Sequence, residues 1–175
     1  MRSRSGSSRS ATDVDRLWTP WRMAYIKGTD RQEGCIFCGL PGLDPAQDEE
    51  SLILARGERA FVIMNKYPYN SGHLMVAAYR HTASYEDLST EEHVEMAEWT
   101  TQCVKALKQL YGPEGFNIGL NLGRAGGAGI VDHLHSHIVP RWTGDTNYMT
   151  TVGGTKVLPE TLEQTYTKLR PLLGT

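Results

Sequence analysis

Three histidines recur at every second position in the segment "VDHLHSHIVPRW", which spans residues 131–142. In a β-strand, successive side chains point to opposite faces. The spacing therefore predicts a strand with one face that carries His133, His135 and His137. Neighbouring imidazoles on such a strand would lie roughly 6.5–7 Å apart. The other face would carry Leu134, Ser136 and Ile138.

This histidine face allows three chemical interpretations. It could be a set of hydrogen-bonded polar side chains, although three buried imidazoles need many partners. A pair of them could bind a metal ion, because histidine is the commonest metal ligand. Alternatively, one neutral imidazole could act as a nucleophile while its neighbours orient it and handle the proton.

A glycine-rich segment, "NLGRAGGAG" (121–129), directly precedes the histidines. Glycines let backbone N–H groups approach an anion closely, and such a concave loop can bind phosphate. The segment lacks the Gly-Lys-Ser/Thr of a P-loop. Its position suggests a phosphate held beside a nucleophile.

The rest of the chain predicts an α+β fold with a largely antiparallel sheet. Four further runs have strand character and are separated by turn residues: 51–55, 59–65, 72–79 and 115–123. Ser89 and Glu92 form a capping box that opens a long helix. Its expected apolar face consists of Val94, Ala97, Thr101, Val104, Leu107 and Tyr111. Pro159 is expected to open a final short helix with Leu162, Tyr166 and Leu169 on one face.

Composition restricts the class of protein. The net charge of −2 and the pI near 6.3 argue against a protein built mainly to coat nucleic acid. No apolar run reaches the ~20 residues of a membrane helix, and the start has no apolar signal segment. Residues 1–16 are expected to be a disordered tail, and 17–175 one domain that begins with an aromatic arm at 17–28. Residues 39–51 are predicted to form a loop.

The three cysteines are Cys35, Cys38 and Cys103, a sparse set that favours a reducing compartment, with the cytoplasm as the default. Cys35 and Cys38 could be a redox pair or half of a zinc site. The redox interpretation expects the pair to follow a strand and open a helix, and the preceding "DRQEG" fits this poorly. Cys103, inside the long helix, is expected to be a core residue.

Longer motifs carry a resemblance to a known family. The segment "HLHSHIVP" resembles the signature of the histidine triad (HIT) nucleotide hydrolases and transferases, with Ser136 as a mild departure. "NKYPYNSGHLMV", "FNIGLNLG" and "GGTKVLP" look most like the branch that contains bacterial diadenosine tetraphosphate phosphorylases. The resemblance runs from about Leu17 to the final helix. It implies a five-stranded antiparallel sheet, one long and one short helix, and a homodimer.

The resemblance also implies site residues. His135 matches the family's nucleophile, which forms a nucleotidyl-histidine intermediate, and its other nitrogen should donate to a backbone carbonyl. His137 would contact the phosphate or its leaving group, and His73 would support the site from behind. The expected nucleotide contacts are Asn65 at the ribose, Ile63 and Lys66 near the base, and Asn121, Gly127 and Gly129 at the phosphates. Gly129 departs from the Ser or Thr of many members, which leaves backbone N–H groups to stabilise a low-pKa leaving group.

By the same resemblance, His81 and His133 would complete a structural zinc site with Cys35 and Cys38. The expected reaction is phosphorolysis of diadenosine tetraphosphate to ATP and ADP, with inorganic phosphate as acceptor. Hydrolysis of nucleotides or phosphoramidates is the first alternative. A nucleotide-binding sensor or scaffold with little turnover is an alternative from another class. No nucleic-acid or membrane partner is expected.

Overall fold

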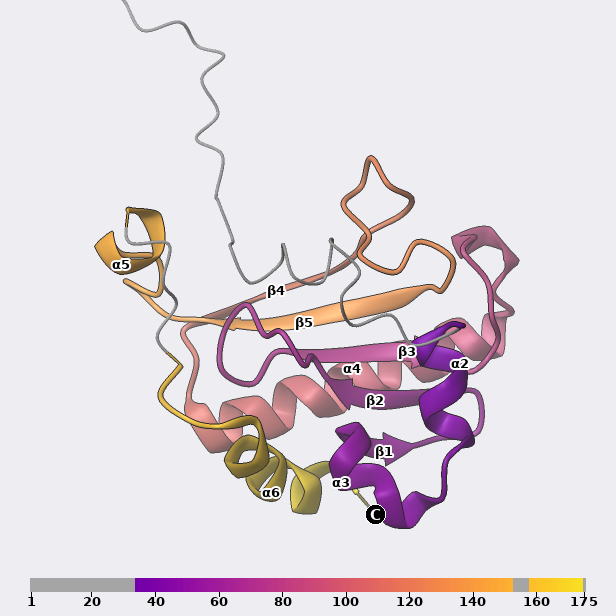
Figure 1. The fold of residues 1–175 in the computed structure, drawn as a ribbon, viewed down its shortest axis with the longest axis horizontal. Helices are drawn as coiled ribbons and strands as arrows, with labels where there is room; N and C mark the ends of the chain where they lie inside the picture. The colour runs from indigo at the N-terminus through magenta and orange to yellow at the C-terminus, as the bar shows by residue number, and fades with distance from the viewer. Residues whose placement is uncertain (1–33, 153–157, 175) are drawn as a thin grey trace, which may run out of the picture.

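The computed structural model describes residues 34–152 and 158–174, and these form an α+β domain around a five-stranded sheet (Figure 1). The strand order is β1-β2-β3-β5-β4, and all neighbouring pairs are antiparallel. This confirms the predicted fold class and sheet. The strands are β1 (Ile53–Arg56), β2 (Ala60–Met64), β3 (Leu74–Ala78), β4 (Gly115–Leu120) and β5 (His135–Arg141).

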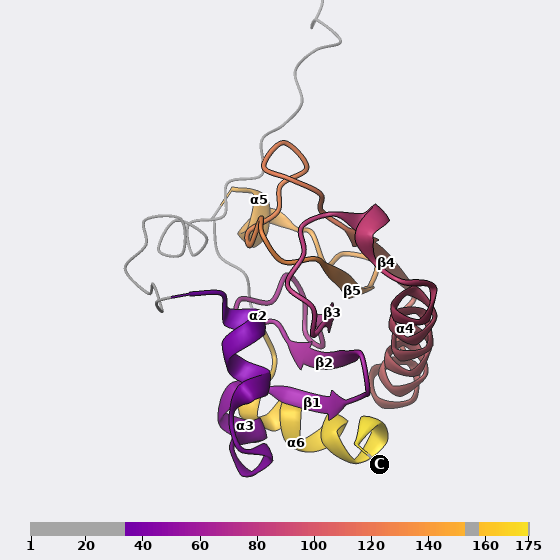
Figure 2. The ribbon, with the colours of Figure 1, turned by 90° about the vertical axis from the view of Figure 1, so that its right-hand side faces the viewer.

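The two faces of the sheet have separate apolar clusters, because strand residues alternate between them. In β2, Val62 and Met64 point to one cluster, while Phe61 and Ile63 point to the other. The first cluster packs under helix α4 (Thr90–Tyr111), and the second lies under the N-terminal helical turns. Figure 2 shows this layering, with α4 on one side of the sheet and α2 (Ile36–Gly39) on the other.

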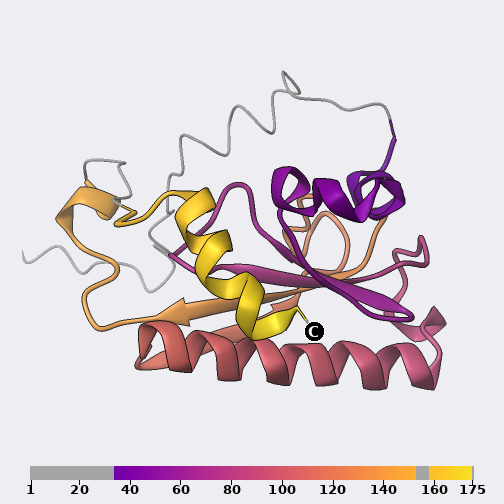
Figure 3. The same ribbon diagram turned by 90° about the horizontal axis from the view of Figure 1, so that it is seen from below.

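Helix α4 begins where the sequence predicts. The Ser89 side chain accepts from the backbone N–H of Glu92, and the Glu92 side chain accepts from the N–H of Ser89. Its buried face was largely predicted wrongly, because Val94, Ala97 and Thr101 are exposed. Of the predicted face Leu107 is buried and Val104 and Tyr111 are partly buried, while the other buried apolar residues are Met96, Cys103 and Ala106. Packing selects this face, because α4 lies along the sheet (Figure 3) and contacts β2, β3 and β5.

The predicted loop at 39–51 is wrong, because most of it is helical. After α2 come the 3₁₀ turns η1 (Leu40–Gly42) and η2 (Pro45–Gln47) and the single-turn helix α3 (Asp48–Ser51). The prolines that suggested a loop occupy first-turn positions of η1 and η2, where a missing N–H costs nothing. Asp44 also caps η2 through the backbone N–H of Ala46.

The final helix, α6 (Leu162–Leu173), begins later than predicted. Thr161 is its N-cap and forms a capping box with Gln164, so Pro159 precedes the helix rather than opening it. The predicted face is right, since Tyr166 and Leu169 are buried against the rest of the domain. The remaining short helices, which the sequence did not indicate, are η3 (Tyr85–Asp87) and α5 (Tyr148–Thr151).

The predicted tail at 1–16 and the arm at 17–28 lie outside the described residues. Among the helices of the described part of the chain, none combines the length and the apolar character needed to cross a bilayer.

Candidate active site

Strand β5 and the bend before it present the three histidines. The prediction of one continuous histidine strand is wrong at its start: β5 begins at His135, and His133 lies in the preceding bend. The N–H of Leu134 donates to the carbonyl of Thr82 at 2.7 Å, which draws this bend away from the strand path. His135 and His137 pair with Ala77 and Met75 of β3, on the face opposite α4.

His135 is held in one tautomer. Its Nδ1 lies 2.8 Å from the carbonyl oxygen of His133, which can only accept, so Nδ1 carries the hydrogen. Nε2 therefore keeps its lone pair. The side chain is 5% exposed, and this burial lowers the pKa of His135, although the bond to the carbonyl opposes the shift. The hydrogen bond matches the one expected for a nucleophilic imidazole.

His137 has the opposite tautomer, which a chain of hydrogen bonds imposes. The backbone N–H of Tyr69 donates to Nδ1 of buried His73 at 3.1 Å, so the neutral His73 ring carries its hydrogen on Nε2. That N–H donates to Nδ1 of His137 at 3.0 Å. The neutral His137 ring therefore carries its hydrogen on Nε2, and it can act as a hydrogen-bond donor.

The two β5 rings are close, with centroids 4.9 Å apart in an edge-to-face arrangement. An imidazole lone pair and an imidazole N–H thus stand side by side at the same surface. This pairing suits attack on a centre whose oxygens need a donor, such as phosphorus in a phosphoanhydride.

A cavity of about 490 Å³ opens over these rings. Of the predicted nucleotide-site residues, six line it: Ile63, Asn65, Lys66, Gly129, His135 and His137. His73 lies behind His137, as expected, while Asn121 and Gly127 are not among the lining residues. Gly127 has a φ of 84°, which a glycine adopts without strain.

Much of the cavity wall was not foreseen from the sequence. It is apolar and comes from α2, η1, the segment after α3, strand β3 and the loop before β5. These residues include Ile36, Phe37, Leu40, Leu52, Met75 and Ile130. Tyr67 and Tyr69 add aromatic rings from the β2–β3 connection. The apolar pair between Cys35 and Cys38 was the available signal for α2, because a solvent-exposed turn has no need of Ile and Phe there.

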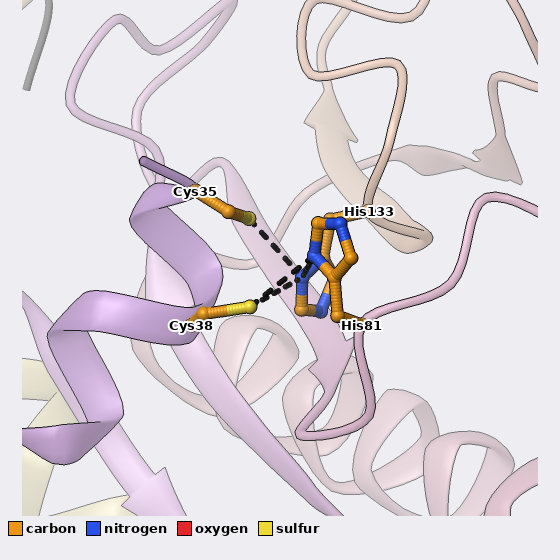
Figure 4. A group of neighbouring side chains, drawn as sticks. All are labelled: Cys35, Cys38, His81 and His133. Atoms are coloured by element: carbon orange, nitrogen blue, oxygen red, sulfur yellow. Dashed lines mark hydrogen bonds between the residues drawn. The ribbon is translucent and has the colours of Figure 1, made fainter. Parts of the chain in front are cut away.

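Cys35, Cys38, His81 and His133 form a second group, the Cys/His cluster, whose ligand atoms all lie within 4.8 Å of one another (Figure 4). Nδ1 of His133 lies 3.2 Å from Sγ of Cys35, and Nδ1 of His81 lies 3.3 Å from Sγ of Cys38. A tetrahedral zinc ion with bonds of about 2.0–2.3 Å sets its ligand atoms roughly 3.3–3.8 Å apart. The cluster fits such an ion.

The surroundings of the cluster support metal binding. Nε2–H of His133 donates to the carbonyl of Ala78 at 2.7 Å, which leaves the Nδ1 lone pair directed at the cluster. Burial, together with the neighbouring Cys35, raises the pKa of Cys38, and a bound cation would offset both effects. The cysteine pair does open a helix, since Cys35 is the N-cap of α2, which meets one of the two expectations for a redox pair. The other expectation, a strand before the pair, concerns a segment that lies mostly outside the described residues. The presence of His81 and His133 beside the two cysteines still favours a metal site over a redox pair.

Known proteins are similar to this chain in sequence. Residues 46–144, which include all six histidines, match the model of the HIT domain. The chain is 41% identical over 170 residues to AP-4-A phosphorylase of Mycobacterium tuberculosis, covering 93% of this chain and 84% of that protein. It is 30% identical over 107 residues to the adenosine 5'-monophosphoramidase of Schizosaccharomyces pombe, covering 61% and 74%.

Solved structures agree with the fold. A Zn-bound histidine triad family protein from Mycobacterium smegmatis matches with a TM-score of 0.63 and 26% identity, over 79% of this chain and 92% of that one. A histidine triad nucleotide-binding protein from Sulfolobus tokodaii matches with a TM-score of 0.62 and 24% identity, over 79% and 91%.

The buried His73 should make the stability of the domain depend on pH. Burial, with the nearby His137 and His135, lowers the pKa of His73 to about 3, from an ordinary value of 6.5. Between these values the unfolded chain binds more protons, so the free energy of unfolding falls as the pH drops below 6.5. The loss between pH 7 and pH 5 should be about 2 kcal/mol.

Urea denaturation of the wild type and of His73→Gln across this pH range measures the effect. Glutamine keeps an acceptor for the Tyr69 N–H but does not titrate, so the difference in stability between the two proteins should shrink toward low pH. A difference that stays constant from pH 7 to pH 5 contradicts the assignment.

Proposed function

Because the chain belongs to the HIT family and is a HIT-family enzyme, we propose that it cleaves dinucleoside polyphosphates with His135 as the nucleophile. The tautomer of His135 is the observation that carries the proposal, since Nε2 of this buried, cavity-lining ring keeps its lone pair. Dinucleotide cleavage in general is supported by the M. tuberculosis relative, and we infer an adenine nucleotide from the same similarity.

The proposed reaction has two displacements. Nε2 of His135 forms a P–N bond to the α-phosphorus of diadenosine tetraphosphate, the bond to the bridging oxygen breaks, and ATP leaves as the anion. An oxygen of inorganic phosphate then forms a P–O bond to the adenylyl group. The P–N bond breaks, its electron pair returns to Nε2, and ADP is released. Splitting one displacement into two in this way is the usual advantage of a covalent intermediate.

Other residues have proposed supporting roles. Nε2–H of His137 would donate to an oxygen on the α-phosphorus, and His73 would hold that tautomer. Asn65 and Lys66, on the cavity wall, would bind the ribose and the nucleotide, with Ile63 against the base. The outer phosphates would be bound by Asn121 and by the backbone of Gly127 and Gly129.

Product analysis tests the reaction. With diadenosine tetraphosphate, ATP and ADP should form only when inorganic phosphate is present. AMP and ATP without phosphate would make the protein a hydrolase, and cleavage of AMP phosphoramidates alone would favour the phosphoramidase reaction of the S. pombe relative.

A variant of the nucleophile separates an enzyme from a sensor. His135→Ala should lose turnover by about 10³-fold or more while it still binds nucleotide, because only the attacking atom is removed. Intact-protein mass spectrometry should detect an adenylyl adduct on the wild type and none on the variant. His93→Ala, on α4 and outside the cavity lining, is the control that should retain activity. Binding without turnover in the wild type as well would favour the sensor.

We propose that the Cys/His cluster binds one structural zinc ion. Its four donors and their spacing support this, as does the Zn-bound relative from M. smegmatis. The ion would tie α2 to the bend before β5 and would take no part in the displacements. A cytoplasmic location, where thiols stay reduced, suits such ligands.

Elemental analysis of the purified protein should find about one zinc per chain. Cys38→Ser should lower this content severalfold and destabilise the fold, because the remaining three ligands leave the shell open. Cys103→Ala, at a buried cysteine outside the cluster, should keep the full content. Folded, active wild-type protein without zinc would refute the proposal.

We also propose a homodimer in which the sheets or long helices adjoin. Strand β4 is an outer strand of the sheet, and Ile118 on it is 50% exposed, which leaves backbone groups and an apolar side chain for a second copy. Sedimentation should give about twice the chain mass of 19.5 kDa, and Ile118→Lys should shift it toward the monomer. A wild-type monomer at micromolar concentration would contradict the dimer.

A further inference from the structure

Phe37 lies between the two cysteines of the Cys/His cluster and also against the histidine of the proposed chemistry. Its side chain is 1% exposed. The ring centroid is 4.8 Å from that of His135, at an interplanar angle of 45°, and 5.4 Å from that of His133, at 61°. Both distances lie in the range of favourable aromatic contacts.

The His135 ring must be held at a fixed angle for its Nε2 to face the cavity. The bond from Nδ1 to the carbonyl of His133 restrains one side of the ring, and His137 packs edge-to-face on another, at 4.9 Å. A single hydrogen bond still permits the ring to tilt about it. Phe37 supplies the remaining contact, from a different element, and so limits that tilt.

The backbone around Phe37 is itself fixed. The N–H groups of Cys38 and Gly39 both donate to the carbonyl of Cys35, at 3.1 Å and 3.0 Å, and this closes the turn that carries the ring. The ring of Phe61 on β2 is also near, with its centroid 6.3 Å from that of Phe37. The closed turn therefore holds the Phe37 ring against the imidazoles of His133 and His135, whose centroids are closer to it than that of Phe61.

We propose that Phe37 is a positioning residue for His135, holding the imidazole so that Nε2 points at the phosphorus to be attacked. This rests on the proposed nucleophilic role of His135. It goes beyond a wall contact, because a residue that only lines the cavity affects how tightly the nucleotide binds. A residue that aligns the nucleophile affects the rate of the covalent step instead, and small misplacements there can cost about 10²-fold.

Single-turnover kinetics on Phe37→Leu test this, with the protein as purified. Formation of the adenylyl adduct from diadenosine tetraphosphate should slow at least tenfold, while KM changes less than threefold. Phe61→Leu is the matched control, because it removes the same side-chain volume from the same apolar cluster. Phe61 has ring contacts with Phe37 and Tyr79 rather than with His135 or His137, so its adduct should form at nearly the wild-type rate.

A second readout does not depend on activity. Two-dimensional ¹H–¹⁵N spectra of the imidazoles should show one Nδ1–H tautomer for His135 in the wild type and in Phe61→Leu, and a mixture in Phe37→Leu. The His135→Gln spectrum assigns the signal. If Phe37→Leu does not fold, Phe37→Met keeps the volume and loses the flat ring, and it should show the same two changes.

The possible results separate this inference from the proposed function. A wild type that forms no adduct refutes the nucleophilic role and the positioning role together. A normal adduct rate and a single tautomer in Phe37→Leu refute the positioning role alone, as does a raised KM with an unchanged rate. Loss of zinc in Phe37→Leu would also overturn it, since the defect would then arise in the Cys/His cluster.

Discussion

His133 makes three separate polar contacts, and the arrangement of the site depends on all of them. Nε2–H donates to the carbonyl of Ala78, which anchors the bend to β3. Nδ1 faces the two cysteines and His81, and the backbone carbonyl accepts from His135. One residue thus connects the sheet, the Cys/His cluster and the proposed nucleophile. Because it precedes β5, it can do this without following the alternation of the strand.

The backbone sets the protonation pattern of the site from both ends. A carbonyl at one end fixes the hydrogen of His135 on Nδ1, and an N–H at the other end, that of Tyr69, fixes the hydrogen of His73 on Nε2. Burial keeps these rings neutral by disfavouring the charged form, most strongly at His73. The result is an acceptor on His135 beside a donor on His137.

Sequence patterns predicted the parts of the fold that follow a local rule. Four strands follow from short β-like runs between turn residues, and the fifth from the alternating histidines. The start of α4 follows from its capping box, which is readable in four residues. The buried face of α4 could not be predicted in this way. Val94 and Met96 are both apolar, and only packing against the sheet determines which of them is buried. The helical turns at 36–51 were missed because their Pro, Gly and Asp residues also favour loops.

The site was predicted unevenly for a related reason. His133, His135 and His137 have reactive side chains at a regular spacing, so the sequence alone suggested a chemical role for them. His81 was assigned to the Cys/His cluster only through the family resemblance. The cavity wall had no such signal: Phe37 and Leu40 are ordinary apolar residues until the fold brings them to the same cavity as His135.

Different parts of the cavity suit nucleoside binding and the proposed reaction. Its wall is mainly apolar, and among the described residues that line it Lys66 is the cation and Glu50 the anion. An apolar wall can bury a nucleoside but offers little to a chain of phosphates, whose charge is better met by backbone N–H groups and by solvent. In the proposed reaction, the nucleoside end should therefore set affinity, and the histidine face should act on the first phosphorus. Substitutions in the wall such as Leu40→Ala should then raise KM, and substitutions that disturb the imidazoles should lower the rate of the covalent step.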